Sequence, residues 1–231
     1  MFVVLIVLIL ALGAAVILMS RRLMALRRQE FIRSFVLPRG LFERLMKRRP
    51  ELALKDCQLV ARALRQFFLA YSNSGHRFVA MPSQVADDLW HEFILYTKDY
   101  DAFCRKAFGH FLHHTPAVVL GGNQVSNAGL RRCWYHACVE ENIRPQRPTR
   151  LPLLFALDAK LNIPDGFRYV PDCDAVRRKS GDPGSAGVHC GTHVGSSSGD
   201  SGGDSGGASD FGGDSTGGDS GCGGGGCGGG D

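Results

Sequence analysis

Residues 83–109 read S-Q-V-A-D-D-L-W-H-E-F-I-L-Y-T-K-D-Y-D-A-F-C-R-K-A-F-G. After Ser83, a good N-cap, apolar side chains recur at three- and four-residue spacing as far as Tyr96, which predicts a helix. Thr97 is the predicted cap of a second helix, and Gly109 is a residue that easily adopts the positive φ found just past a helix end. The stretch therefore predicts two consecutive helices.

Helical spacing also extends on both sides of this stretch. Apolar side chains from residue 56 to residue 71 form one wide stripe, and a further helix is expected over about 127–142. Residues 153–161 are expected to form a short helix, and residues 167–170 a brief strand. The predicted fold class is mainly α, with an N-terminal transmembrane helix, a compact helical domain and a disordered tail rich in glycine, serine and aspartate.

The first twenty residues form an apolar run without a charged side chain, long enough to cross a bilayer as a helix. Arg21, Arg22, Arg27 and Arg28 follow it. By the positive-inside rule we expect residue 1 outside and the domain in the cytoplasm. The alternative is a cleaved signal peptide, which would normally carry basic residues before its apolar stretch. Because none precede it, the sequence favours an uncleaved single-pass anchor.

The predicted organisation has four parts: an anchor over residues 1–20, a basic juxtamembrane segment over 21–36, a globular helical domain over 37–172 and a low-complexity tail over 173–231. From residue 195 the chain is almost entirely glycine, serine and aspartate. Such a segment buries too little apolar surface to offset its chain entropy. We therefore expect the tail to be disordered.

The formal net charge of +5 comes from basic residues before the tail. Arg21, Arg22, Arg27 and Arg28 cluster beside the apolar run rather than among aromatic residues of the domain, which favours anionic lipid head groups over nucleic acid as the partner.

The eight cysteines are scattered without a framework spacing. In a cytoplasmic domain they are expected to remain thiols, mostly as small buried hydrophobes.

One cluster of residues has side chains suited to binding a metal ion. It comprises Asp87, His91, Cys104, His113 and His114. Asp87 and His91 are four residues apart and share a helix face, so the carboxylate can orient the imidazole. Adjacent side chains diverge, so only one of His113 and His114 is expected to complete the site. The predicted metal ligands are His91, His113, His114 and Cys104, with zinc as the predicted ion.

Simpler interpretations stand beside this hypothesis. His91 with Asp87 and Asp88 also fits a solvated polar face, and Cys104 lies in an apolar stripe, where cysteine is more often core than ligand. Cys133 and Cys138 are five residues apart on the expected helix and point in different directions, so buried thiols are the better interpretation. In the tail, His189, Cys190, His193, Cys222 and Cys227 offer ligands that nothing preorganises.

The segments M-P-S-Q-V-A-D-D-L-W-H-E-F-I-L-Y-T, Y-D-A-F-C, G-H-F-L-H-H-T-P and L-P-L-L-F-A-L-D resemble the bacterial members of the glycine-rich domain-containing protein-like family. The resemblance covers roughly residues 37–169. Its motif residues are Asp87, Trp90, His91, Tyr100, Cys104, Gly109, His113 and His114. It implies a polar site but no reaction. Plant relatives often carry a second histidine two residues past the first, where this chain has Phe93.

The sequence thus leads to two hypotheses about function. The first is a membrane-anchored helical domain with a polar Asp/His site that binds zinc, in which Asp87 and His91 are the candidate catalytic residues. In an enzymatic version Asp87 orients His91, and His91 acts as metal ligand or general base. The alternative is a non-enzymatic scaffold or interaction module at the membrane. Whether the protein is an enzyme stays open at this point.

Overall fold

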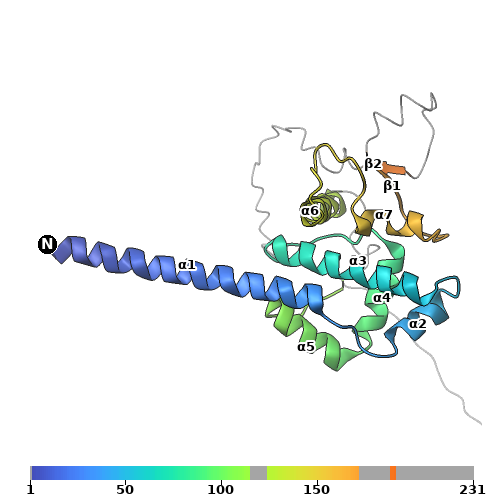
Figure 1. Cartoon of the computed structure of the whole chain (residues 1–231), viewed down its shortest axis with the longest axis horizontal. Helices are drawn as coiled ribbons and strands as arrows, with labels where there is room; N and C mark the ends of the chain where they lie inside the picture. The colour runs from blue at the N-terminus through green and yellow to red at the C-terminus, as the bar shows by residue number, and fades with distance from the viewer. Residues whose placement is uncertain (1, 115–123, 172–187, 191–231) are drawn as a thin grey trace, which may run out of the picture. The chain divides into compact units, whose positions relative to one another are not determined.

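The computed structural model describes residues 2–114, 124–171 and 188–190, which form seven helices and one two-stranded sheet (Figure 1). The predicted mainly α fold is confirmed. The elements are α1 (Phe2–Ser34), α2 (Leu41–Arg48), α3 (Leu54–Asn73), α4 (Gln84–Ile94), α5 (Thr97–Phe108), α6 (Gln124–Glu140), α7 (Leu153–Lys160), β1 (Arg168–Val170) and β2 (Val188–Cys190). The remainder of the expected disordered tail lies outside the described residues.

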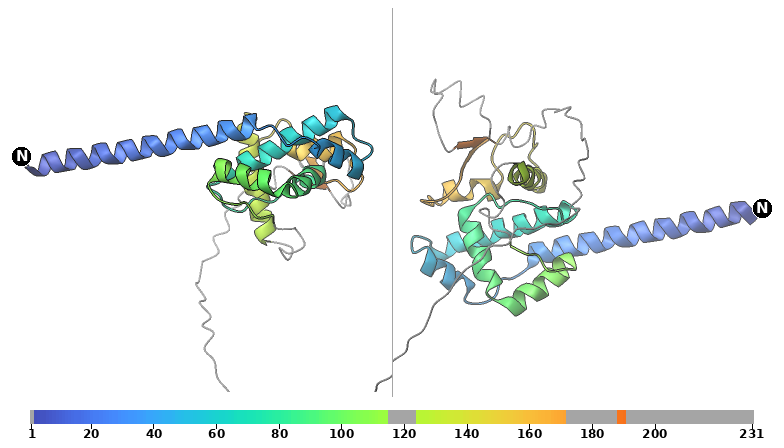
Figure 2. Two further views of the ribbon diagram at one scale, coloured as in Figure 1. Left: turned by 90° about the horizontal axis from the view of Figure 1, so that it is seen from below. Right: turned by 180° about the vertical axis from the view of Figure 1, so that it is seen from behind.

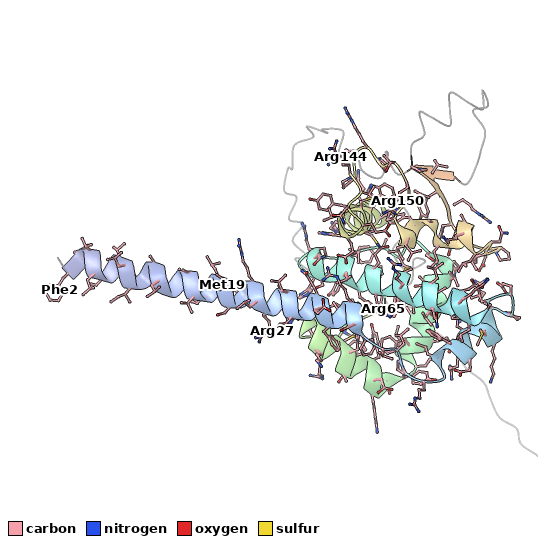
Figure 3. All side chains as sticks on the ribbon, in the orientation of Figure 1. Phe2, Met19, Arg27, Arg65, Arg144 and Arg150 are labelled. Atoms are coloured by element: carbon pink, nitrogen blue, oxygen red, sulfur yellow. The ribbon has the colours of Figure 1, made fainter. Side chains whose placement is uncertain are left out.

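Helix α1 contains both the apolar run and the basic segment that follows it. It continues to Ser34 because no glycine or proline interrupts residues 21–34, which are rich in strong helix formers. Its apolar side chains are exposed as far as Leu26, whereas Ile32 is fully buried. Figure 3 labels Phe2 and Met19 on the exposed stretch. Helix α1 is long and apolar enough to cross a membrane. A signal sequence near the N-terminus can have the same length and composition.

Helix α3 is the centre of the domain. It contacts α1, α2, α4, α6 and α7, and it buries eleven of its twenty residues (Figures 1 and 2). Its observed range includes the predicted helix over residues 56–71. Helix α2, which the sequence analysis did not predict, buries Leu41 and Leu45 beside it. With only eight residues, α2 offers two apolar anchors, too few to establish a helical period.

Helices α4 and α5 follow each other as predicted, with one difference at their junction. Ser83 caps α4 through its hydroxyl, which accepts a hydrogen bond from Ala86 N. The helix ends at Ile94, and Tyr96 occupies the N-cap position of α5 with a non-helical backbone. Thr97, the expected cap, is therefore the first residue of α5. Gly109 ends α5 at φ 86°, as its predicted role requires.

The second half of the domain covers the other side of α3. Helix α6 buries Trp134, and α7 buries Phe155, whose rings meet edge to face with centroids 5.0 Å apart. The predicted short helix over 153–161 is thus confirmed. Strand β1 pairs in parallel with β2, with Tyr169 opposite His189. Strand β2 lies inside the segment that was expected to be a disordered tail, so this expectation is wrong for residues 188–190. These three residues pair with β1 through backbone hydrogen bonds.

Candidate metal site

Helix α4 carries two residues of the candidate site, and a carboxylate from a distant part of the chain holds its first turn. Asp158 is 1% exposed. Its oxygens accept hydrogen bonds from the Ser83 hydroxyl at 2.7 Å and from the backbone N–H groups of Gln84, Val85 and Phe167 at 2.7, 3.3 and 2.9 Å. The first N–H groups of a helix lack intrahelical partners and carry partial positive charge. Asp158 therefore fixes the N-terminal end of α4, where Asp87 lies in the first turn.

A second buried carboxylate holds the opposite flank of α4. Asp88 is fully buried, and Arg49 Nε donates a hydrogen bond of 2.7 Å to its Oδ2, while Arg48 Nε lies 3.1 Å from Oδ1. Arg49 also forms a bidentate pair with Asp165. The interpretation of Asp88 as part of a solvated polar face is wrong. Basic residues of the unpredicted helix α2 and its C-cap compensate its charge, which allows it to be buried.

Tyr100 holds the loop that carries the third site residue. The Trp90 indole N–H donates to the Tyr100 hydroxyl at 3.1 Å, and this hydroxyl donates to the carbonyl of Leu112 at 2.7 Å. Burial raises the pKa of Tyr100, so the hydroxyl keeps the proton that it donates. Because Leu112 precedes His114 by two residues, this chain of hydrogen bonds fixes the loop against α4 and α5.

Asp87, His91 and His114 converge on one point. Asp87 Oδ1 is 2.9 Å from His114 Nε2, and Asp87 Oδ2 is 3.4 Å from His91 Nδ1. The two imidazole rings are tilted by 54° to each other with centroids 4.3 Å apart, and the Trp90 ring packs edge to face on His114 at 4.4 Å. One ligand atom from each of the three residues lies within 4.8 Å of the other two. Three side chains that could each supply one ligand to a metal ion therefore lie together, with the Trp90 ring packed against one of them.

His91 Nδ1 has no hydrogen-bond partner among the described residues, although it is shielded from solvent. It approaches Asp87 without forming a hydrogen bond, while the His91 side chain as a whole is 40% exposed. A buried ring nitrogen without a partner normally costs stability. Its position between a carboxylate and a second imidazole is where a metal ion would satisfy it.

The structure places the other predicted ligands away from this point. His113 is exposed, and its ring lies 4.9 Å from that of Phe111, so His114 is the histidine of the adjacent pair that joins Asp87 and His91. Cys104 is fully buried. Its thiol interacts with the Leu112 backbone and the Tyr100 hydroxyl, and burial raises its pKa. As a neutral thiol it supports the loop before His114.

The second cysteine pair has the environment that the sequence predicted. Cys133 and Cys138 are fully buried free thiols on α6. Burial raises the pKa of both, that of Cys138 to about 12, so both remain protonated at neutral pH. Between them, His136 is partly buried, and burial followed by the charge of Arg77 lowers its pKa. Neither thiol is poised for metal binding or nucleophilic chemistry.

Replacing Tyr100 by phenylalanine is expected to lower the free energy of unfolding by about 1 to 3 kcal/mol, because a buried indole N–H loses its acceptor and the Leu112 carbonyl its donor. Denaturant unfolding followed by fluorescence measures this directly, since both tryptophans of the chain, Trp90 and Trp134, are buried in the domain. The matched control is Tyr135→Phe, whose side chain is 49% exposed. Equal effects of the two changes would contradict the proposed role of Tyr100.

Sequence reasoning missed Asp158 and Arg49 as residues that position the site. The signal for Asp158 was an acidic residue in the otherwise apolar run L-P-L-L-F-A-L-D, which indicates a buried charge with a structural partner. Arg49 gave no comparable signal, because it is one of three basic residues in the run K-R-R at 47–49.

Comparison with known proteins gives one match. A family model described as UCP032817-like matches residues 27–194, which is more than half of the chain. A search of curated proteins and a search of solved structures found no match. The resemblance to the glycine-rich domain-containing protein-like family is therefore wrong, because the segments on which it rested lie inside the match to a different family. The candidate site also lies within the matched residues.

Proposed function

The chain belongs to the UCP032817-like family. Because the description of this family names no activity, we propose a function from the geometry of the site alone. The proposal is a membrane-anchored helical domain that binds zinc through Asp87, His91 and His114. The observation that carries it is His91 Nδ1, which is buried without a hydrogen-bond partner beside a carboxylate and a second imidazole.

The distances support a single ion. With metal–ligand bonds of about 2.0 to 2.1 Å, the ligand atoms of a tetrahedral zinc ion lie about 3.3 Å apart. Asp87 Oδ1 and His114 Nε2 are 2.9 Å apart, and Asp87 Oδ2 and His91 Nδ1 are 3.4 Å apart. These two distances involve different oxygens of Asp87, and all three ligand atoms lie within 4.8 Å of one another, so side-chain rotations would have to bring them onto one ion. Two imidazoles and a carboxylate are ligands that zinc commonly uses.

Three protein ligands leave one position of a tetrahedral ion open. Structural zinc sites are usually closed by four protein ligands, whereas catalytic sites keep the fourth position for water or substrate. The side chains of Asp87 and His91 are 22% and 40% exposed, so a solvent molecule can reach the ion. We therefore assign the site a role in activating water or polarising a bound group, with Trp90 as its apolar wall.

Helix α1 supplies the proposed location. Its apolar side chains are exposed, which is unfavourable in water and favourable in lipid. Arg21, Arg22, Arg27 and Arg28 follow the apolar run and would meet anionic head groups. The positive-inside rule then places the N-terminus outside and the domain in the cytoplasm.

Zinc binding by the purified full-length protein tests the proposal. We expect one zinc ion per chain, and replacement of His91 or His114 by alanine should weaken binding at least about 100-fold, because two ligands hold an ion poorly. The matched control is His113→Ala, since this neighbouring histidine lies outside the cluster. Titration with a competing chelator gives the affinities. Because zinc must displace protons from the imidazoles, the affinity should fall on acidification.

Cobalt substitution separates this site from the cysteines of the chain. A cobalt(II) ion bound by nitrogen and oxygen ligands lacks the thiolate charge-transfer band that cysteine ligation produces. A thiolate band, or equal loss of zinc in the His113→Ala and His114→Ala variants, would overturn the assignment. Zinc that persists at full stoichiometry in both His91→Ala and His114→Ala would do the same.

A further inference from the structure

A group of three basic side chains, separate from the candidate metal site, lies where α1 joins the domain. It consists of Arg28, His76 and His110, here called the basic junction. Arg28 donates a hydrogen bond of 3.2 Å to the carbonyl of Phe108, and its guanidinium lies so close to Gly109 that a Cβ there would be 2.9 Å from an Arg28 nitrogen. The basic junction therefore couples α1 to the end of α5.

The two histidines are brought together by aromatic neighbours. Their ring centroids are 4.8 Å apart, and His110 Nε2 shares a hydrogen bond of 2.9 Å with the Tyr71 hydroxyl. His76 stacks on the Tyr71 ring and packs edge to face on Phe108. His76 also has a positive φ of 62°, which is uncommon for a residue other than glycine. The fold thus holds two imidazoles side by side at some conformational cost.

The basic junction lacks a counter-ion among the described residues. The groups that act on His76 are His110 and Arg28, both bases, and burial followed by these two groups lowers its pKa. Among the described residues, Arg28 donates a hydrogen bond to a single carbonyl oxygen, although a guanidinium has five N–H donors. Two imidazoles and a guanidinium without a carboxylate match the donors that bind a phosphate group.

The length of α1 sets the distance of the basic junction from a membrane. Arg28 comes eight positions after Ser20, the end of the apolar run, which corresponds to about 12 Å along a helix. The head-group layer of one leaflet is about 5 to 8 Å thick. Arg28 then lies within one Debye length, about 8 Å, of the head groups. Because Gln29 also bonds Asn73 at 2.9 Å, the domain is held to α1 at this level.

We propose that the basic junction binds the phosphate of an anionic lipid head group and so docks the domain on the membrane that α1 crosses. This inference rests on the proposed anchoring by α1. Phosphate oxygens would accept hydrogen bonds from Arg28 and from the imidazoles of His76 and His110. Binding favours the protonated imidazoles, so docking should strengthen as the pH falls. Tyr71 and Phe108 are the uncharged groups that pack against the two rings.

Hydrogen–deuterium exchange of the full chain in lipid nanodiscs tests the proposal. Backbone amides of residues 74–78 and 109–112 should exchange about fivefold more slowly in discs that contain phosphatidylglycerol than in phosphatidylcholine discs, and more so at about pH 6 than at about pH 7.5. Arg28→Gln should abolish the difference, and the double change His76→Gln, His110→Gln should remove its pH dependence. The control is Arg144→Gln, an exposed residue that Figure 3 shows beyond α6.

Three outcomes would overturn the proposal. The first is equal exchange in both lipids, and the second is protection that Arg28→Gln leaves intact. The third is equal protection in phosphatidylcholine discs on addition of inorganic phosphate, which would make soluble phosphate the ligand. Tryptophan fluorescence shows whether a variant is still folded. Arg28→Lys keeps the positive charge and is the conservative control for Arg28→Gln. Protease access to α1 tests anchoring separately. If α1 is inserted but the amides show no slower exchange, docking by the basic junction is contradicted and anchoring by α1 is not.

Discussion

Replacing Asp158 by alanine is expected to lower the free energy of unfolding by about 3 to 5 kcal/mol. The change removes the acceptor of four hydrogen bonds, from Ser83, Gln84, Val85 and Phe167. The N–H of Val85 is then left buried without a partner, since Val85 is fully buried. Denaturant unfolding followed by the fluorescence of Trp90 and Trp134 measures the loss.

The same change should also weaken zinc binding, because the first turn of α4 positions Asp87. Asp101→Ala is the matched control: this carboxylate pairs with Arg105 on the surface and is 40% exposed. Exposed ion pairs contribute about 0 to 1 kcal/mol, so its loss should be small. If Asp158→Ala and Asp101→Ala destabilise the protein equally, Asp158 does not hold α4 in the way its contacts indicate.

Replacing Arg49 by methionine is expected to cost about 3 to 5 kcal/mol, because it leaves the Asp88 carboxylate buried without a hydrogen-bond donor. Arg48 also approaches Asp88, but Asp88 Oδ1 has no hydrogen-bond partner among the described residues, and the Arg48 side chain is 48% exposed. Arg48→Met is therefore the matched control and should cost about 1 kcal/mol or less. Denaturant unfolding of both variants gives the two values.

A double variant makes this prediction sharper. Removing both charges, as in Arg49→Met with Asp88→Leu, should recover most of the lost stability, because a buried ion pair contributes little compared with apolar side chains of similar size. The cost of the single change is mainly that of an isolated buried charge. A double variant that is as unstable as the sum of both single variants would show that Arg49 acts through other contacts, such as those with Asp165.

Much of the helical framework could be predicted from local pattern. Ser83 as a cap, Gly109 as a helix end and the stripe over residues 56–71 are encoded by neighbouring residues, and the structure confirms each of them. The pattern failed where a helix was too short to show a period, as in α2. It also failed where a charge was judged by its own helix alone, as with Asp88.

The candidate site could be predicted only in part. Asp87 and His91 share a helix face because they are four residues apart, and this follows from helix geometry. Which of two adjacent histidines turns toward them depends on how the loop after α5 leaves Gly109. The hydrogen bonds of Tyr100 with Trp90 and Leu112 fix that loop. No local pattern contains this information.

The sequence by itself determined the elements of this protein: an apolar N-terminal helix long enough to span a membrane, amphipathic helices after it, and the shared face of Asp87 and His91. These follow from residues within one or two helical turns of each other. Only the tertiary structure decided that His114 joins the site, that Asp88 is buried and that Asp158 holds α4. Their partners lie far away along the chain, so packing of the whole domain had to bring them together.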